Sequence, residues 1–306
     1  MTNTSNYIHN QPDWPNFYWD HETLATPLSK AKAERARLLG RVQSLGFEVR
    51  QDPVLKTITA DEGDQVRESV ARRLGMRSGG LVRFGRYIDG VGEMLLDATS
   101  KYEEPLTSRR LFGWHASLFP SHRSGIRTIR TGAYRDDAEG PIQVFSEDNG
   151  KRCVHFEGPE ASKLEREMDA FLSWFDQTED EWIITAALAH LWFVTIHPFD
   201  DGNGRIARAI SDMSLARSEK SSQRFYSLSS QILKERASYD EILGATTQTS
   251  TMDVTPWLNW FIGCASRAVE SSQATIANVL SEAVFLNANT DERQRLMVEA
   301  SLRWLQ

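Results

Sequence analysis

The chain has few cysteines and no long apolar run, and each shortage excludes a class of protein. Its 306 residues include two cysteines, Cys153 and Cys264, which lie far apart and lack metal-ligand spacing. This usage disfavours a disulfide framework and favours a reduced, cytoplasmic compartment. No apolar run approaches the roughly 18 residues of a membrane-spanning helix, and residues 1–19 lack the apolar core of a signal peptide. We therefore expect a cytoplasmic protein that does not contact a membrane.

The chain also lacks an excess of positive charge. It has 35 Lys and Arg against 42 Asp and Glu, for a net charge of −7. Proteins that bind nucleic acid usually carry a strong basic surface, so we do not expect a nucleic-acid partner. Hydrophobic residues make up 40% of the chain and charged residues 25%, a globular balance that predicts a sizeable core.

Helical patterns dominate the sequence. Residues 27–46 begin with proline, end near glycine and carry leucines at amphipathic spacing. Residues 180–196 are apolar on nearly all sides, which predicts a helix buried at the centre of a bundle. Aromatic residues between 7 and 20 are predicted to cap the core. Further helices are expected near 64–75, 89–101, 107–118, 159–177, 204–217, 229–244, 253–285 and 290–305.

The predicted fold class is mainly α, a helical bundle with one small inserted β-hairpin. Glycines, β-branched residues and turn signals predict the strands, which we place near 126–131, 141–146 and 152–157. We divide the chain into four parts: 1–60, an N-terminal helical and aromatic region; 61–124, a helical segment leading into the core; 125–250, the core itself; and 251–306, the C-terminal helices.

Residues 197–208, HPFDDGNGRIAR, concentrate the residue types that phosphate chemistry needs. Pro198 ends the preceding helix, and the glycines keep the following turn open. The backbone N–H groups of Gly202, Asn203 and Gly204 are then expected at the start of the next helix. Such a helix start is an anion site, and the two glycines let a phosphate approach the backbone closely.

Four side chains of this stretch complete the inventory. Asp201 is a hard carboxylate that suits Mg²⁺ shared with phosphate oxygens. Arg205 and Arg208 are three residues apart on one helix face and can clamp further phosphates. His197 is the only group of the stretch able to act as a base near neutral pH. A base, a metal ligand, a phosphate nest and two clamps together indicate phosphoryl or nucleotidyl transfer.

The stretch resembles the active-site loop of the Fic family. The family pattern is His-x-Phe-x-(Asp/Glu)-Gly-Asn-Gly-Arg-x-x-Arg, and every fixed position is matched. The likeness extends to LAHLWFVTIHPF, SSQRFYSLSSQI and YIHNQPDWPNF, over about residues 5–270. The resemblance implies the Fic fold and the transfer of AMP from ATP to a Ser, Thr or Tyr hydroxyl of a target protein, with self-modification expected.

The resemblance also implies roles for the loop residues. His197 would deprotonate the target hydroxyl, whose oxygen attacks the α-phosphate of ATP while pyrophosphate leaves. Asp201 would hold Mg²⁺, and the backbone of Gly202, Asn203 and Gly204 would cradle the phosphates. Arg205 would stabilise the leaving pyrophosphate, and Arg208 would grip the γ-phosphate.

Residues outside those positions receive roles by the same resemblance. Phe199 would anchor the loop in the core. The hairpin at 141–146 would correspond to the flap of the family, in which Ile142, Gln143 and Val144 align the target peptide by strand addition. Tyr239 would touch the adenine.

Glu62 is the candidate for an inhibitory residue. Many Fic proteins carry a self-inhibiting helix, (Ser/Thr)-x-x-x-Glu-(Gly/Asn), whose glutamate pairs with the second motif arginine, here Arg208. Glu62 and Gly63 match the end of that pattern, but Ile58 stands where Ser or Thr is expected. The stretch from Glu62 to Val66 is also several residues short. We therefore expect Glu62 to miss Arg208 and inhibition to be weak.

Several alternatives stay open at the level of the sequence. Within the same fold, the loop could transfer another nucleotide or remove AMP from a modified protein. In a different class, the chain could be a nucleotide-sensing module, although a pure sensor has no use for a base such as His197. The identity of the target protein and the oligomeric state, with a homodimer among the options, are also open.

Overall fold

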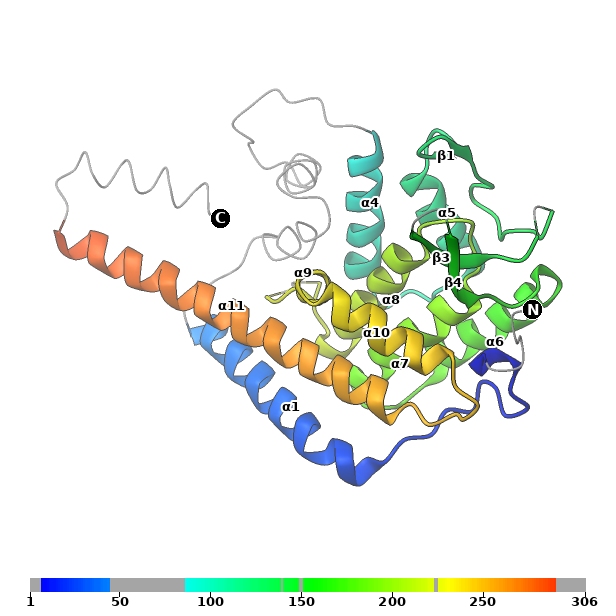
Figure 1. The fold of residues 1–306 in the computed structure, drawn as a ribbon. Coiled ribbons are helices and arrows are strands. Elements are labelled where there is room, and N and C mark those ends of the chain that lie inside the picture. The colour runs from blue at the N-terminus through cyan, green and yellow to red at the C-terminus, as the bar shows by residue number, and fades with distance from the viewer. Residues whose placement is uncertain (1–6, 45–85, 139, 149–150, 223–224, 290–306) are drawn as a thin grey trace.

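The computed structural model describes residues 7–44, 86–138, 140–148, 151–222 and 225–289 (Figure 1). Helices dominate these residues, in agreement with the predicted class. Their bounds are α1 (His21–Ser44), α4 (Arg86–Ser100), α5 (Ser108–Leu118), α6 (Leu164–Gln177), α7 (Trp182–Ile196), α8 (Asn203–Glu219), α9 (Leu228–Lys234), α10 (Arg236–Thr247) and α11 (Thr255–Asn289), with short 3₁₀ turns at Ile8–Asn10 and Ala161–Lys163. The helices predicted at 64–75 and 290–305 lie outside the described residues.

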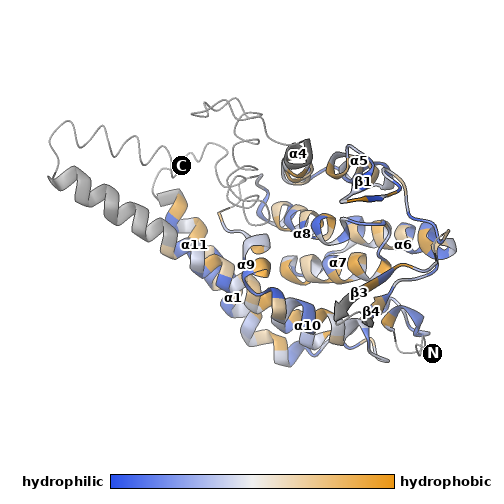
Figure 2. Cartoon of the chain, turned by 45° about the horizontal axis from the view of Figure 1, so that its top comes forward, coloured by the Kyte–Doolittle hydropathy of each residue, from blue (hydrophilic) through white to orange (hydrophobic). Residues whose placement is uncertain are grey.

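Helix α7 forms the centre of the molecule. Every residue from Ile183 to Ile196 is buried, as the apolar sequence of this segment predicts. The C-terminal part of α7 packs into a core shared with α4, α5, α6 and α8. Its N-terminal part packs into a core shared with α1, α9, α10 and α11. The ribbon of α7 has the orange of hydrophobic residues along much of its length in Figure 2. A loop that follows this helix is therefore attached to the most enclosed element of the fold.

Helix α1 lies along α11 at one side of the bundle (Figure 1). Its start differs from the prediction, because Pro27 lies inside the helix instead of beginning it. Asp20 is the reason: its Oδ1 accepts the N–H groups of Glu22 at 2.9 Å and Thr23 at 3.2 Å. An aspartate in this capping position starts a helix by satisfying its first amides.

The aromatic segment before α1 covers the central core. Trp14 and Phe17 pack edge-on against Trp192, with ring centroids 6.2 Å and 5.9 Å apart. The indole Nε1 of Trp14 also donates to Glu167 Oε2 of α6 at 2.8 Å. The predicted cap of residues 7–20 is thereby confirmed.

The strands form two separate antiparallel hairpins. The first pairs β1 (Arg123–Ser124) with β2 (Arg127–Thr128), and the second pairs β3 (Gln143–Asp148) with β4 (Lys151–Glu157). The pair β3–β4, called the flap hairpin below, confirms the predicted insertion. Sequence reasoning expected a longer strand at 126–131 and missed its pairing with β1, because a two-residue strand carries no periodic signal.

The segment predicted as one helix at 229–244 is two helices. The break falls at Glu235, whose backbone has a φ of −107° and a ψ of 25°. Both carboxylate oxygens of Glu235 accept from Arg267 of α11, at 2.6 Å and 2.5 Å. This ion pair holds the bend between α9 and α10 against α11, and a contact between distant residues is invisible to helical periodicity.

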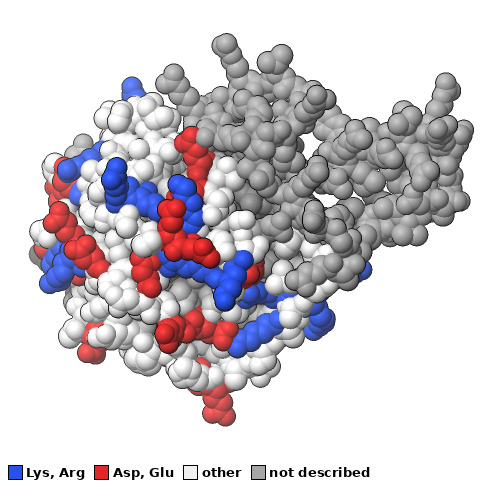
Figure 3. All heavy atoms as spheres, turned by 180° about the vertical axis from the view of Figure 1, so that it is seen from behind, with Lys and Arg blue, Asp and Glu red and all other residues white. Residues whose placement is uncertain are grey.

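The surface of the described residues carries charges of both signs. On the face shown in Figure 3, basic and acidic side chains are interspersed among uncharged ones. None of the described helices combines the length and the apolar character needed to cross a membrane.

Candidate active site at the start of α8

The predicted loop joins α7 to α8 and begins with a strained residue. His197 donates its N–H to the Phe193 carbonyl at 3.0 Å, as a continuing helix would. Its φ of 50° and ψ of 58° are nevertheless left-handed, a conformation that residues with a side chain rarely adopt. The chain therefore turns sharply at His197, and Pro198 prevents the helix from continuing. The imidazole is held at the end of a rigid, buried element.

The His197 ring is in the form that a general base requires. Its Nδ1 lies 3.2 Å from the Val194 carbonyl, which can only accept, so Nδ1 carries the hydrogen and Nε2 keeps its lone pair. Burial is the main cause that lowers the pKa of His197 to about 4; the Arg135 cation contributes to this lowering, and the Val194 carbonyl and Asp201 oppose it. At pH 7 the ring is neutral and able to accept a proton.

Helix α8 begins on a glycine that the packing requires. Gly202 has a φ of 83° and a ψ of 0°, and a Cβ at this position would lie 2.9 Å from Cε2 of Phe119. The Ile206 N–H donates to the Gly202 carbonyl at 3.0 Å, so the amides of Asn203 and Gly204 belong to the open first turn. The amide of Gly202 itself donates to Asp201 Oδ1 at 2.5 Å. Of the predicted phosphate donors, Gly202 is thus already bonded to the carboxylate.

Asn203 and Phe199 close the loop into a fixed turn. The Asn203 Oδ1 accepts the Phe199 N–H at 3.0 Å, and its Nδ2 donates to the Phe199 carbonyl at 2.7 Å. Phe199 is fully buried and stacks on the His115 ring at a centroid distance of 4.3 Å. The predicted anchoring of the loop by Phe199 is confirmed, and the Asn203 side chain serves the loop while its backbone stays at the helix start.

The Asp201 carboxylate stands beside the helix start with 42% of the side chain exposed. One oxygen accepts from Gly202 and lies 3.4 Å from an Arg205 nitrogen, while the other accepts the Ser124 hydroxyl. Among the described residues, no group of three or more His, Cys, Asp or Glu side chains could hold a metal alone. A single oriented carboxylate fits Mg²⁺, which takes few protein ligands and completes its shell with water and substrate phosphates.

The two arginines extend from the first turns of α8 in different directions. The Arg205 guanidinium lies 5.0 Å from the centroid of the Phe119 ring. The charge of Arg208 instead acts on the α7 and α10 side. Burial lowers the pKa of His190 and Arg208 adds to this effect, whereas burial raises the pKa of Tyr239 to about 12 against the lowering effect of Arg208. The fold therefore places one cation on each side of the helix start. Glu62, the candidate inhibitory residue that is expected to miss Arg208, lies outside the described residues.

The predicted target-aligning residues lie at the start of the flap hairpin. Ile142 accepts the Gly158 N–H at 3.0 Å, Gln143 donates to Glu157 Oε2 at 2.8 Å, and the Val144 side chain is 42% exposed. Within the described part of the chain, β3 pairs with β4 alone. Its second edge therefore has no paired strand among these residues, and target alignment would use such an edge.

Tyr239 lies in the core below the site. Its hydroxyl is 2.9 Å from Nε2 of His190, and its ring packs against Trp257 and Trp260. His190 is fully buried and also lies 3.3 Å from the Ser211 hydroxyl, so both of its ring nitrogens have partners inside the core. The structure thus gives Tyr239 a packing role, and its contact with adenine stays a prediction.

The central segment of the chain matches a known family. A model described as the Fic/DOC family matches residues 105–215, from the residues before α5 to most of α8, including the loop and the flap hairpin. Residues 105–215 of the chain therefore form a domain of the Fic/DOC family. A second model, described as a domain of unknown function (DUF4172), matches residues 7–76.

Two relatives with named activities match parts of the chain. The protein adenylyltransferase Fic of Nematostella vectensis is 31% identical over 152 residues, which cover 48% of this chain and 30% of that protein. The uridine 5'-monophosphate transferase of Xanthomonas campestris pv. campestris (strain 8004) is 37% identical over 121 residues, which cover 37% of this chain and 21% of that protein. The chain spans less than a third of the length of either relative.

Solved structures share the fold at low identity. A Fic family protein from Desulfovibrio desulfuricans G20 has a TM-score of 0.60 at 22% identity, over 81% of this chain and 74% of that one. Fic-1 from C. elegans has a TM-score of 0.55 at 17% identity, over 83% of this chain and 73% of that one. These likenesses confirm the predicted Fic-fold bundle.

Three residues of the Fic domain that were not predicted contact the loop. His115 accepts the Gly132 N–H on Nδ1 at 3.1 Å, so its Nε2 carries a hydrogen and donates to the Asp201 carbonyl at 3.2 Å. Ser124 donates to the Asp201 carboxylate, and Arg135 donates to the His197 carbonyl at 2.8 Å. These residues precede their partners by 62 to 86 positions, so no sequence spacing could have revealed them.

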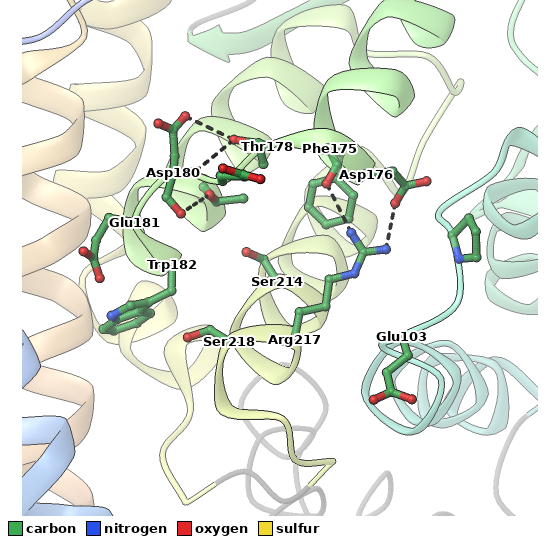
Figure 4. Close-up of a pocket in the computed structure, with 13 residues that line it drawn as sticks. Glu103, Phe175, Asp176, Thr178, Asp180, Glu181, Trp182, Ser214, Arg217 and Ser218 are labelled. Atoms are coloured by element: carbon green, nitrogen blue, oxygen red, sulfur yellow. Dashed lines mark hydrogen bonds and ion pairs between the residues drawn. The ribbon is translucent and has the colours of Figure 1, made fainter.

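A pocket of about 900 Å³ opens elsewhere in the Fic fold, beside the turn between α6 and α7 (Figure 4). Its lining includes Asp176, Glu181 and Arg217 and none of the predicted site residues. Arg217 donates to three backbone carbonyls and to the Asp176 carboxylate, so its charge is already matched within the protein. This pocket is a junction of packed elements, and the groups suited to phosphate chemistry lie at the start of α8.

Proposed function

We propose that the chain transfers AMP from ATP to a Ser, Thr or Tyr hydroxyl of a target protein, itself included. The observation that carries the proposal is the neutral His197 imidazole, with Nε2 unprotonated, on the loop that also holds an oriented carboxylate, an open helix start and two arginines. A base in this setting serves group transfer to a hydroxyl, since binding of a nucleotide alone would not require one.

The reaction follows from the chemistry of these groups. Nε2 of His197 takes the proton of the target hydroxyl as its oxygen forms a bond to the α-phosphorus of ATP. The bond between the α-phosphorus and the oxygen bridging to the β-phosphorus breaks, and pyrophosphate leaves with the electron pair. The imidazolium then returns its proton to solvent. The left-handed turn at His197 fixes the direction from which this proton can be taken.

The groups at the start of α8 can bind the negatively charged phosphates. The amides of Asn203 and Gly204 and the positive end of the helix favour an anion at this point. Arg205 and Arg208 add charge-assisted hydrogen bonds on the two sides of the helix start. Asp201 would hold Mg²⁺, which would neutralise charge on the phosphates when bound.

The target would approach along the flap hairpin. An extended segment can add to the open edge of β3 through main-chain hydrogen bonds and present its hydroxyl to the loop. The activity named for the Nematostella relative supports AMP as the transferred group. Cytoplasmic location and homodimer formation stay predictions.

Transfer of UMP is the second candidate, favoured by the activity named for the Xanthomonas relative. The loop residues address phosphates, which all nucleoside triphosphates share. The base must therefore be selected elsewhere in the chain, and the loop does not distinguish the two nucleotides.

Labelled nucleotides test the proposal. The full chain is incubated with Mg²⁺, cell lysate and one nucleotide at a time: ATP labelled in the α-phosphate, ATP labelled in the γ-phosphate, or UTP labelled in the α-phosphate. The proposal expects protein-bound label from α-labelled ATP. Label from α-labelled UTP alone supports the second candidate, label from γ-labelled ATP indicates kinase chemistry, and binding without label indicates a sensor. Release of AMP from a pre-modified protein would indicate the reverse reaction.

A further inference from the structure

Arg135 lies between the loop and the flap hairpin with its side chain only 1% exposed. Each guanidinium nitrogen donates to a different segment: Nε to the His197 carbonyl at 2.8 Å, Nη1 to Asp137 Oδ1 at 2.9 Å and Nη2 to the Pro159 carbonyl at 2.5 Å. Its own N–H donates to the Pro198 carbonyl at 2.9 Å. A buried guanidinium with every nitrogen bonded is fixed in one geometry.

The first of these contacts supports a strained backbone. A left-handed conformation is unfavourable for a residue with a side chain and persists where the surroundings enforce it. The carbonyls of His197 and Pro198, the two peptide groups that define this turn, both accept from Arg135. The direction of the imidazole follows from that backbone, so Arg135 holds the turn from which His197 acts.

The other two contacts reach the two ends of the flap hairpin. Asp137 precedes β3, and Pro159 follows β4. Asp137 also joins these ends directly, because its Oδ2 accepts the Ala161 N–H at 2.6 Å. One guanidinium thus binds the segment that enters the hairpin, the segment that leaves it and the active-site loop.

Gly158 shows how closely these parts approach each other. A Cβ on Gly158 would lie 2.6 Å from Cγ2 of Ile142, 3.2 Å from Nη2 of Arg135 and 3.5 Å from Cβ of His197. The base of the flap hairpin therefore packs directly on the arginine and on the histidine. A shift of the guanidinium would move the hairpin and the loop relative to each other.

We infer that Arg135 is a positioning residue that sets the catalytic base and the target-aligning strand at a fixed separation. The inference rests on the proposed function, because the separation matters only when a target on the flap hairpin must present its hydroxyl to His197. Arg135 touches no reacting atom. A lysine at this position keeps the charge but cannot donate to three divergent acceptors from one fixed plane.

The test compares Arg135→Lys with the wild type in the full chain. We expect kcat for label transfer to fall tenfold or more, while the Kd for ATP with Mg²⁺ changes less than about twofold, because the phosphates bind at α8. Asp137→Asn removes one contact and leaves the bond to His197, so a smaller loss of kcat is expected. In Arg135→Ala, added guanidinium ion should restore part of the lost kcat by occupying the vacated site.

Arg110→Lys is the matched control. The Arg110 side chain is 10% exposed, and it also donates to a carboxylate, Asp97 Oδ2 at 2.6 Å, and to several backbone carbonyls. Its contacts join α4 to α5 and do not reach His197. We expect this variant to lose stability as Arg135→Lys does and to keep the kcat of the wild type.

A spectroscopic signal separates this inference from the proposed function. In NMR spectra of protein with isotope-labelled histidines, the backbone and ring resonances of His197 should shift in Arg135→Lys and stay in place in Arg110→Lys. This expectation holds whether or not the chain transfers a nucleotide. Absence of label transfer by the wild type would overturn the proposed nucleotide transfer but would not contradict the positioning role of Arg135. Unchanged His197 resonances, or a folded Arg135→Lys with wild-type kcat, would overturn the positioning role. If Arg135→Lys does not fold, Asp137→Asn decides by the same two readouts.

Discussion

The histidines of this Fic domain show how burial sets protonation at single residues. Burial lowers the pKa of His197 to about 4 and that of His190 to about 3, and it also lowers the pKa of His115. Each ring has hydrogen-bond partners in the protein that suit its neutral form. His190 and His115 use these bonds for packing, whereas Nε2 of His197 remains available for chemistry.

The low pKa of His197 predicts an unusual dependence of rate on pH. The rate per folded molecule should stay nearly constant from about pH 8 to pH 5 and reach half its maximum near pH 4, because the ring stays neutral in that range. Unfolded histidine binds a proton near pH 6.5, so the free energy of unfolding should fall as the pH drops from about 6.5 to 4. Circular dichroism measures the folded fraction at each pH, so that the rate can be expressed per folded molecule. A midpoint near pH 6.5 would contradict the assigned environment of His197.

Sequence spacing identified the loop residues and missed their supports. The placement of His197, Asp201, Arg205 and Arg208 around one helix start was predictable because these residues lie in one short stretch, and their chemical roles stay predictions. Arg135 could not be predicted, since its contacts depend on three segments meeting in space. The same limit applies to the bond between Asp201 and the Gly202 amide, which only the turn geometry reveals.

At the scale of elements, the start of α8 depends on Gly202. We expect Gly202→Ala to destabilise the protein by about 1–3 kcal/mol, because a left-handed residue would gain a Cβ. That Cβ would also lie 2.9 Å from Phe119, at the end of α5, and displace the helix start. The rate of label transfer should also fall, because the displaced helix start carries the phosphate-binding groups. Urea unfolding and initial rates measure the two effects.

Gly244→Ala is the control for this substitution. Gly244 lies inside α10, and a Cβ there would meet nothing within 4 Å. Alanine is the better helix former by about 1 kcal/mol, so this variant should be more stable than the wild type and equally active. Equal destabilisation of the two variants would show that the turn at Gly202 imposes no special requirement.

Element boundaries were predicted less well than element types, for physical reasons. Asp20 starts α1 ahead of Pro27, and the ion pair between Glu235 and Arg267 divides α9 from α10. A cap and a tertiary ion pair outweigh the local pattern in these places. The buried helix α7 was predicted well, because its sequence is apolar on every side.

At the scale of the whole molecule, the fold places the loop at the end of the helix that two cores share. Inhibition by Glu62 would require its carboxylate to reach Arg208. The short stretch after Glu62 predicts that its carboxylate misses this arginine, because a helix advances about 1.5 Å and turns about 100° per residue. Glu62→Gly should therefore change the initial rate of self-labelling little. A tenfold gain, equivalent to about 1.4 kcal/mol, would show that Glu62 inhibits the enzyme.

The most direct test of the account is label transfer by His197→Ala, with nucleotide affinity measured on the same preparation. The phosphates are expected to bind to the backbone and arginines of α8, so the Kd for ATP with Mg²⁺ should stay within about threefold of the wild type. Transfer from α-labelled ATP should drop by about a hundredfold or more, the usual contribution of a general base. Transfer by His197→Ala above about a tenth of the wild-type rate would contradict the assignment of His197 as the base.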